Sequence, residues 1–304
     1  MSLIERFTGQ PDTEVPFGNL IANPQITRPI SYQLLFMRSL AINEIELVQA
    51  IRRYHSSLAG AQVEILDLMR QDCAAEESGS MIGLAGWANH VVKIVGFDSP
   101  IPQIVFDTCV RPAHFNEQLK ADAALHRSHA LLYYAGYETD PLERYVAMTV
   151  VAAALSRFDA SLLLNETARS AFPAGALLAE DGETDSLELL RSMPIPLLYG
   201  GFSKIEIEDE PGVWMRTFGN RNLHLPDLAY KAEGHHQGSE TFDLFANILS
   251  YIRETGANFA AGHTMQIGDD IYLRLRAPAE AEWYLESDGQ MLVAEKIVAA
   301  QVKH

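Results

Sequence analysis

Cysteine is scarce in this sequence, and long apolar runs are missing. Its 304 residues include two cysteines, Cys73 and Cys109, which form no CxxC pattern. A chain of this length buries a core without disulfides, so we expect both thiols to be reduced, as in a cytoplasmic protein. The most apolar helical stretch, 145–155, is far shorter than the roughly 20 residues that a bilayer span needs, and the first residues lack a secretory signal pattern. No membrane association is predicted.

Positive charge is also in deficit. The 40 acidic residues against 23 Lys and Arg give a formal charge of −17. Residues 1–199 hold 14 basic and 24 acidic residues, and residues 200–304 hold 9 and 16, so no basic half exists. Nucleic acid binding depends on Lys and Arg that displace counterions, so nucleic acid is excluded as the default partner. The motifs G-x-S-x-G, G-x-x-x-x-G-K-[ST], H-E-x-x-H and G-x-G-x-x-G after a strand are absent, and no cofactor is predicted.

The first part of the chain shows alternating strand and helix signals. Residues 1–30 contain four prolines and are predicted to form an irregular arm. Asn43 with Glu46 and Asp140 with Glu143 supply helix caps, and Pro112 is expected to break or kink the third helix. Apolar spacing predicts strands at 32–37, 63–66, 130–134 and 161–164, further strands within 81–97, a polar loop at 73–80, and helices at 43–58, 141–158 and 102–127.

An acidic linker, 179–186, is the predicted boundary between a lobe at 31–178 and a lobe at 187–304. In the second lobe, Ile205 with Ile207, residues 213–217 and residues 271–276 have the pattern of half-buried strands. Ser239 is expected to cap a helix that ends at Gly256. The predicted fold is therefore α+β, with two closely packed lobes of ferredoxin-like, mixed or antiparallel sheets and helices on one face.

The ten histidines are the first candidates for a site. His126 and His129 lie three residues apart, but no acid or cysteine follows at ligand spacing, so no metal is predicted. The segment from Gly234 to Glu240 contains His235 and His236 and leads into a helix start, where backbone amides favour an anion. A solvated loop is the alternative. His224 and His263 join this site if the strands that carry them are neighbours.

Three arginines in the second lobe allow two interpretations. Arg216, Arg274 and Arg276 either form a pocket for a carboxylate or pair across strands with Glu206 and Glu208. Aromatic residues are less ambiguous. The three tryptophans are expected in the core or at an interface rather than as ligand platforms: Trp87, Trp214 and Trp283.

Several short segments resemble a known family. They are Arg216-Thr217-Phe218-Gly219, Asn222-Leu223, Leu225-Pro226-Asp227, the helix SETFDLFANILSYI, the segment from Ala261 to Gln266, the segment from Phe97 to Pro102, and the strand and helix from His129 to Phe158. Over about residues 30–298 the chain resembles the bacterial domain of unknown function 4261 (DUF4261). The resemblance implies a cytoplasmic bacterial protein of mixed α and β structure. It implies no activity and no catalytic residue.

These observations favour a non-enzymatic binding or protein-interaction module, immunity and adaptor proteins included, with a basic protein as its partner. The alternative is a hydrolase or a small-anion sensor that uses the histidines of the second lobe. The ligand-binding candidates are His224, His235, His236, Ser239, His263 and Arg216. Two half-buried sheets in an apolar, acidic chain also favour a homodimer, because closed twofold assemblies are the commonest soluble oligomers.

Overall fold

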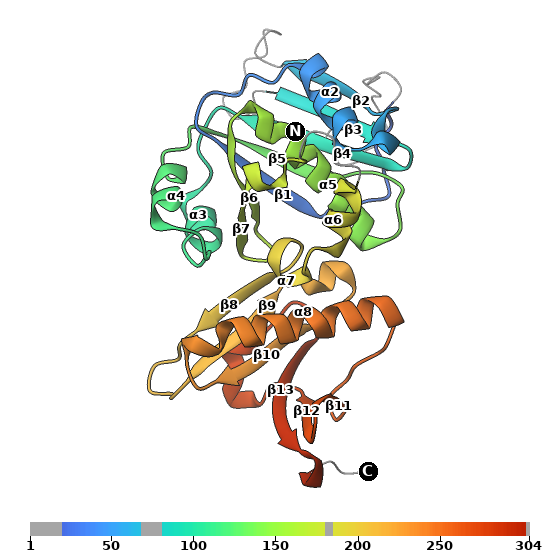
Figure 1. Ribbon diagram of the computed structural model, residues 1–304. Coiled ribbons are helices and arrows are strands. Elements are labelled where there is room, and N and C mark those ends of the chain that lie inside the picture. The colour runs from blue at the N-terminus through green and yellow to red at the C-terminus, as the bar shows by residue number, and fades with distance from the viewer. Residues whose placement is uncertain (1–19, 68–80, 180–184, 302–304) are drawn as a thin grey trace. The chain divides into compact units, whose positions relative to one another are not determined.

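The computed structural model describes residues 20–67, 81–179 and 185–301. It divides into two compact units: unit 1 comprises Met1–Glu166 and Ala171–Ser192, and unit 2 comprises Thr167–Ser170 and Met193–His304. Each unit is built on one sheet with helices, which confirms the α+β class (Figure 1). The predicted loop at 73–80, most of the linker at 179–186 and the first 19 residues of the predicted arm lie outside the described residues.

The sheet of unit 1 has the strand order β2-β3-β4-β5-β1-β6-β7. Its inner strands β6-β1-β5-β4 have the order of a ferredoxin-like sheet, with β1 antiparallel to both β5 and β6. The strands are β1 Ser31–Phe36, β2 Gln62–Asp67, β3 Met81–Trp87, β4 His90–Phe97, β5 Ser128–Tyr134, β6 Ala160–Asn165 and β7 Ser170–Pro173.

Helices cover both faces of this sheet, not the single face that was expected, because β1 carries apolar side chains on both of its sides. On one face the ring of Tyr32 lies 5.5 Å from that of Tyr145 in α5. On the other face Leu35 packs in one cluster with Phe106 of α3, because successive residues of a strand point to opposite sides. The helices of unit 1 are α2 Glu44–Tyr54, η1 Ser56–Leu58, α3 Gln103–Cys109, α4 Glu117–Ala123, α5 Pro141–Leu155, η3 Ser156–Phe158, η4 Ala174–Leu177 and α6 Ser186–Ser192.

Local signals placed most of these helices correctly. Asn43 accepts a hydrogen bond from the amide of Glu46 at 3.1 Å, and Asp140 accepts one from the amide of Leu142 at 2.8 Å. The expected long helix at 102–127 is broken into α3 and α4 with Pro112 between them, because proline has no amide donor. Cys109 is buried, whereas Cys73 lies outside the described residues.

The sheet of unit 2 has the strand order β11-β12-β13-β10-β9-β8. Its one parallel pair is β10 with β13, and each of its other neighbouring pairs is antiparallel. The strands are β8 Gly201–Ile205, β9 Val213–Phe218, β10 Asp227–Ala232, β11 Thr264–Gly268, β12 Ile271–Arg276 and β13 Met291–Val298. Between and around them lie α7 Ile195–Leu198, η5 Asn220–Leu223, η6 His235–Gln237, α8 Gly238–Thr255, η7 Glu280–Leu285 and η8 Ala299–Gln301.

Helix α8 lies across one face of this sheet, where Phe202 of β8 meets Phe242 and Phe245 (Figure 1). The short helix η7 lies on the opposite face, where Leu285 packs with Trp214. Two predictions were wrong here. Ser239 does not cap α8, because the helix begins one residue earlier with Gln237 at the cap position. The strand expected at Ile205 and Ile207 ends at Ile205.

The end of α8 was predicted correctly. Gly256 has a φ of +66°, which favours glycine, and its amide donates to the carbonyl of Ile252 at 2.9 Å. Within the described part of the chain, no helix is long and apolar enough to cross a bilayer.

Candidate functional site

The four candidate histidines of the second lobe, His224, His235, His236 and His263, are scattered over unit 2. His224 precedes β10 and His235 follows it, so the six residues of that strand, about 20 Å, separate them. His263 directly precedes the edge strand β11, where its carbonyl accepts from the amide of Leu275 in β12. Strand β11 lies three strand spacings, or about 14 Å, from β10. Only His235 and His236 are neighbours. The structure does not assemble these histidines into one pocket, and ligand binding by any one of them stays a prediction.

The loop before α8 is held by its own contacts. The Nε2 atom of His235 lies 2.9 Å from Oε1 of Glu206, and Lys204 donates to the carbonyl of His235 at 3.3 Å. The Gln237 side chain accepts from the amide of Glu233 at 2.8 Å. Ser239 is exposed in the first turn of the helix. The segment is therefore a surface loop that its own hydrogen bonds hold in place.

The pair His126 and His129 has a structural role in unit 1. His126 accepts the amide of Ile101 at Nε2, 2.9 Å, and its Nδ1 lies 2.9 Å from the carbonyl of Ala123. Nδ1 of His129 lies 2.7 Å from the carbonyl of Ser99. Burial lowers the pKa of both imidazoles, since it disfavours their charged form. Among the described residues, no group of three or more His, Cys, Asp or Glu side chains is arranged to hold a metal ion.

A shallow depression of about 430 Å³ lies between α3 and α4. Phe106 and Val110 contribute its buried apolar part, and Arg111 and Lys120 are the cations beside it. Arg111 pairs with Asp107 at 3.1 Å. The Lys120 ammonium already donates to Glu117 at 2.9 Å and to the carbonyl of Arg111 at 3.0 Å. This depression therefore offers paired cations rather than one directed at a ligand.

Arg216 is the most unusual charged side chain of unit 2, because it is only 1% exposed. Its Nη1 donates to the carbonyls of Tyr284 at 3.0 Å and Glu286 at 3.3 Å, and its Nη2 donates to Glu286 at 3.2 Å. The guanidinium also lies 4.0 Å from the centre of the Phe218 ring. Burial lowers the pKa of Arg216 to about 10, which leaves it protonated at neutral pH. Arg216 thus fixes the end of η7 from inside the unit, and ligand binding by Arg216 stays a prediction.

A buried carboxylate accompanies this arginine. Asp227 accepts hydrogen bonds from the hydroxyl of Thr217 at 3.3 Å and from the amide of Asn220 at 3.2 Å. Ser287, just after η7, donates to its second oxygen at 2.5 Å. Burial raises the pKa of Asp227, and Ser287 and Arg216 act against that shift. Arg216, Thr217 and Asp227 are among the residues that resemble the DUF4261 family, and here they join β9, β10 and the end of η7.

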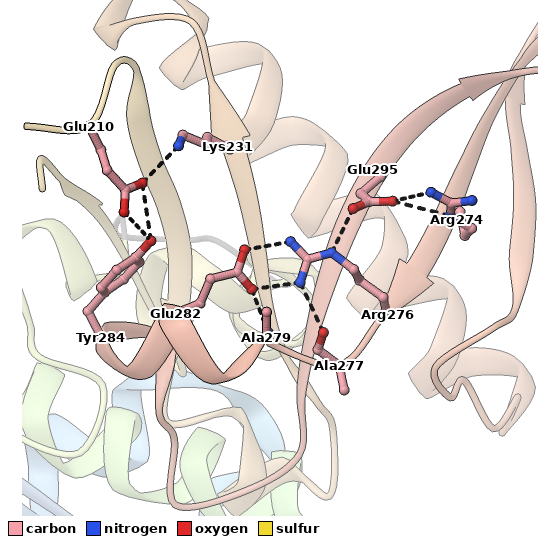
Figure 2. Close-up of polar contacts among 9 residues, drawn as sticks. All are labelled: Glu210, Lys231, Arg274, Arg276, Ala277, Ala279, Glu282, Tyr284 and Glu295. Carbon is pink, nitrogen blue, oxygen red and sulfur yellow. Dashed lines mark hydrogen bonds and ion pairs between the residues drawn. The ribbon is translucent and has the colours of Figure 1, made fainter.

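The outer side of η7 is held by a second set of contacts (Figure 2). Arg276 lies between two carboxylates, with two bonds of 2.6 Å to Glu282 and one of 2.6 Å to Glu295. The Glu282 bonds raise the pKa of Arg276, and the same bonds lower the pKa of Glu282. Arg274 donates to the other oxygen of Glu295 at 2.6 Å. The expected partners Glu206 and Glu208 were wrong, because β12 pairs with β13, which carries Glu295, and not with β8.

Tyr284 adds a third attachment (Figure 2). Its hydroxyl donates to Glu210 at 3.0 Å, and Lys231 donates to the same carboxylate at 2.8 Å. The Tyr284 ring lies 6.0 Å from the ring of buried Trp214. Leu285, the next residue, is fully buried. In η7, the side chains of Tyr284 and Leu285 are therefore anchored, whereas the ring just before them, at 283, is exposed.

The exposed ring is Trp283, whose exposed fraction of 76% contrasts with 3% for Trp214. Glu280 and Glu286 are exposed on either side of it in the chain, and neither has an ion-pair partner in the part that the structure describes. We call Trp283, Glu280 and Glu286 the Trp283 surface. Trp283 was expected in the core or at an interface, and its exposure shows that it is not a core residue. Its acidic neighbours in the run AEAEWYLESD were the signal that it is not.

Comparison with known proteins places one family on this region. Residues 216–294 match the model of a domain of unknown function, DUF4261. The matched segment runs from Arg216 through η7 and into β13. It therefore contains both the buried Arg216 with its bonds to η7 and the exposed ring of Trp283. No curated protein and no solved structure matches the chain.

Proposed function

We propose that the domain whose residues 216–294 match the DUF4261 family model is a protein-binding module whose partner docks on the Trp283 surface. One observation carries the proposal: an indole that is 76% exposed stands on a segment fixed by a fully buried arginine. Tryptophan, tyrosine and arginine dominate the binding energy of protein interfaces.

The rigidity of η7 supports the same conclusion. Burying a guanidinium is expensive, and apolar replacements of buried ion pairs are often neutral or stabilising. Arg216 is thus better explained by the position that it gives to η7 than by stability alone. A backbone segment already held in its bound position loses little conformational entropy on association, which strengthens binding. Adaptor and immunity proteins act through contacts of this kind, so both roles agree with the proposal.

Capture of partners by the full chain tests the proposal. Wild type, Trp283→Ala and Tyr251→Ala are immobilised and exposed to an extract of the source cell, and retained proteins are compared quantitatively. Tyr251 is the matched control, because it is 50% exposed on α8, on the opposite face of the same sheet. We expect a protein that wild type and Tyr251→Ala retain and Trp283→Ala loses. Equal retention by all three variants would contradict the proposal.

The cytoplasmic location and the homodimer also stay proposals. Light scattering of the purified chain at micromolar concentration tests the homodimer directly. A mass equal to that of one chain removes it.

A further inference from the structure

We infer that the group recognised at the Trp283 surface is an arginine side chain of the partner. The inference rests on the proposed function and names the chemistry of its ligand. Two features on the same segment favour a cation: the exposed indole of Trp283, and the carboxylates of Glu280 and Glu286, which have no ion-pair partner among the described residues. A cation above an indole face is attracted by the ring quadrupole, and a flanking carboxylate adds charge-assisted hydrogen bonds.

The neighbouring cations are already engaged, which leaves the surface with surplus negative charge. Arg276 is bonded to Glu282 and Glu295, and Lys231 is bonded to Glu210. Arg216 is buried behind η7 and cannot reach solvent. Glu280 precedes Trp283 by three residues in η7, which is kinked between them at Glu282, and three residues of chain span at most about 10 Å. Glu286 follows three residues later, with its carbonyl held by Arg216.

Other occupants fit these charges less well. A second copy of the chain carries the same charge of −17 and would bring like charges together at this surface. An apolar helix needs a groove, whereas Trp283 is flanked by exposed carboxylates. Between the two cationic side chains, arginine fits better, because its planar guanidinium stacks on an aromatic face and still offers N–H groups to carboxylates at its edge.

Three matched peptides test the inference on the full chain. One short, fluorescent peptide carries three arginines among glycines and serines, and its twins carry citrulline or lysine at the same positions. Binding is followed by anisotropy at low salt. We expect the citrulline twin to bind about tenfold more weakly, because it keeps the shape and loses the charge. The lysine twin is expected to be weaker by about two- to fivefold.

Variants locate the binding and separate it from bulk charge. Trp283→Leu is expected to weaken binding of the arginine peptide by about two- to fivefold, which is the contribution of an exposed cation–π contact. The double variant Glu280→Gln/Glu286→Gln is compared with Glu233→Gln/Glu254→Gln, which removes the same charge from two exposed carboxylates elsewhere on unit 2. We expect the first pair to weaken binding more than the control pair does.

Each contrary result has a definite meaning. Equal weakening by the two double variants, equal binding of the citrulline twin, lysine binding as tight as arginine, or no binding at millimolar peptide would each overturn the inference. Trp283-dependent capture of a partner without arginine selectivity would overturn only this inference and leave the proposed function standing. Arginine selectivity at Trp283 without any Trp283-dependent capture would overturn the proposed function instead.

Discussion

Replacing Arg216 by methionine tests the idea that a buried cation positions η7. Methionine keeps much of the apolar volume and removes the three hydrogen bonds to the carbonyls of Tyr284 and Glu286. A fully buried carbonyl left without a donor costs about 1–3 kcal/mol, so these part-buried carbonyls contribute at most that amount, and Asp227 loses its nearby positive charge. Removing one member of a buried charge arrangement costs about 3–5 kcal/mol, and we expect Arg216→Met to destabilise unit 2 by that amount.

The matched control is Arg274→Met, on a strand of the same sheet. Arg274 pairs with Glu295 at a side-chain exposure of 49%, so its loss is expected to cost less than about 1 kcal/mol. Urea unfolding gives the two free energies, and hydrogen exchange of residues 280–286 gives the local effect. We expect faster exchange there in Arg216→Met only. If the two variants lose equal stability and η7 exchanges at the wild-type rate in both, the claim that Arg216 positions η7 is refuted.

Three further predictions concern stability. Gly201→Ala is expected to destabilise unit 2 by about 3 kcal/mol in urea unfolding, because a Cβ there would lie 1.8 Å from the carbonyl oxygen of Ala168. The control Gly268→Ala, whose Cβ would meet its nearest neighbour at 3.9 Å, is expected to change stability little, and an equal loss in both would contradict the packing argument. Burial lowers the pKa of His90, His126 and His129 below 6.5, so the unfolded chain binds protons first as the pH falls. The free energy of unfolding should therefore decrease below about pH 7, by up to about 1.4 kcal/mol per pH unit for each histidine, and His126→Gln should flatten the profile; a flat wild-type profile between pH 7 and 5 would count against it. Trp283→Ala should change the melting temperature hardly at all, since its ring is 76% exposed, and a loss comparable to that of Arg216→Met would mean that Trp283 is a structural residue.

Much of the fold followed from short-range signals in the sequence. Asp140 before Pro141 is a cap followed by the residue best suited to the first helical position, and α5 begins there. Gly256 ends α8 because glycine adopts a positive φ without strain. The strand and helix order of unit 1 was enough to predict its α+β class, since each of those elements has its own periodicity. The ferredoxin-like order was expected from the strands up to 130–134, whereas it is the last strand, β6, that lies beside β1.

Long-range features were beyond those signals. The parallel pairing of β10 with β13 joins segments about sixty residues apart, and nothing local to either strand specifies its partner. For that reason Arg274 and Arg276 were assigned to the wrong glutamates. Ser239 has the chemistry of a cap, but the preceding turn at 235–237 starts the helix earlier.

The candidate site was anticipated only in part. Arg216 stood out by its charge within an apolar strand, but its burial depends on η7, which packs over it from far along the sequence. The histidines drew attention because of their chemistry, and the sheet then separated them. The exposure of Trp283 was not predicted, since exposure is a property of the folded surface and not of the residue type.

The affinity of a captured partner for wild type and for Trp283→Ala is the most direct test of the central claim. Isothermal titration with the purified partner gives both dissociation constants under identical conditions, with Tyr251→Ala as the control. Truncation of a central tryptophan in an interface costs about 2 kcal/mol or more, so we predict that Trp283→Ala binds at least about thirtyfold more weakly. A dissociation constant for Trp283→Ala equal to that of wild type and Tyr251→Ala would contradict the claim that this surface is the binding site.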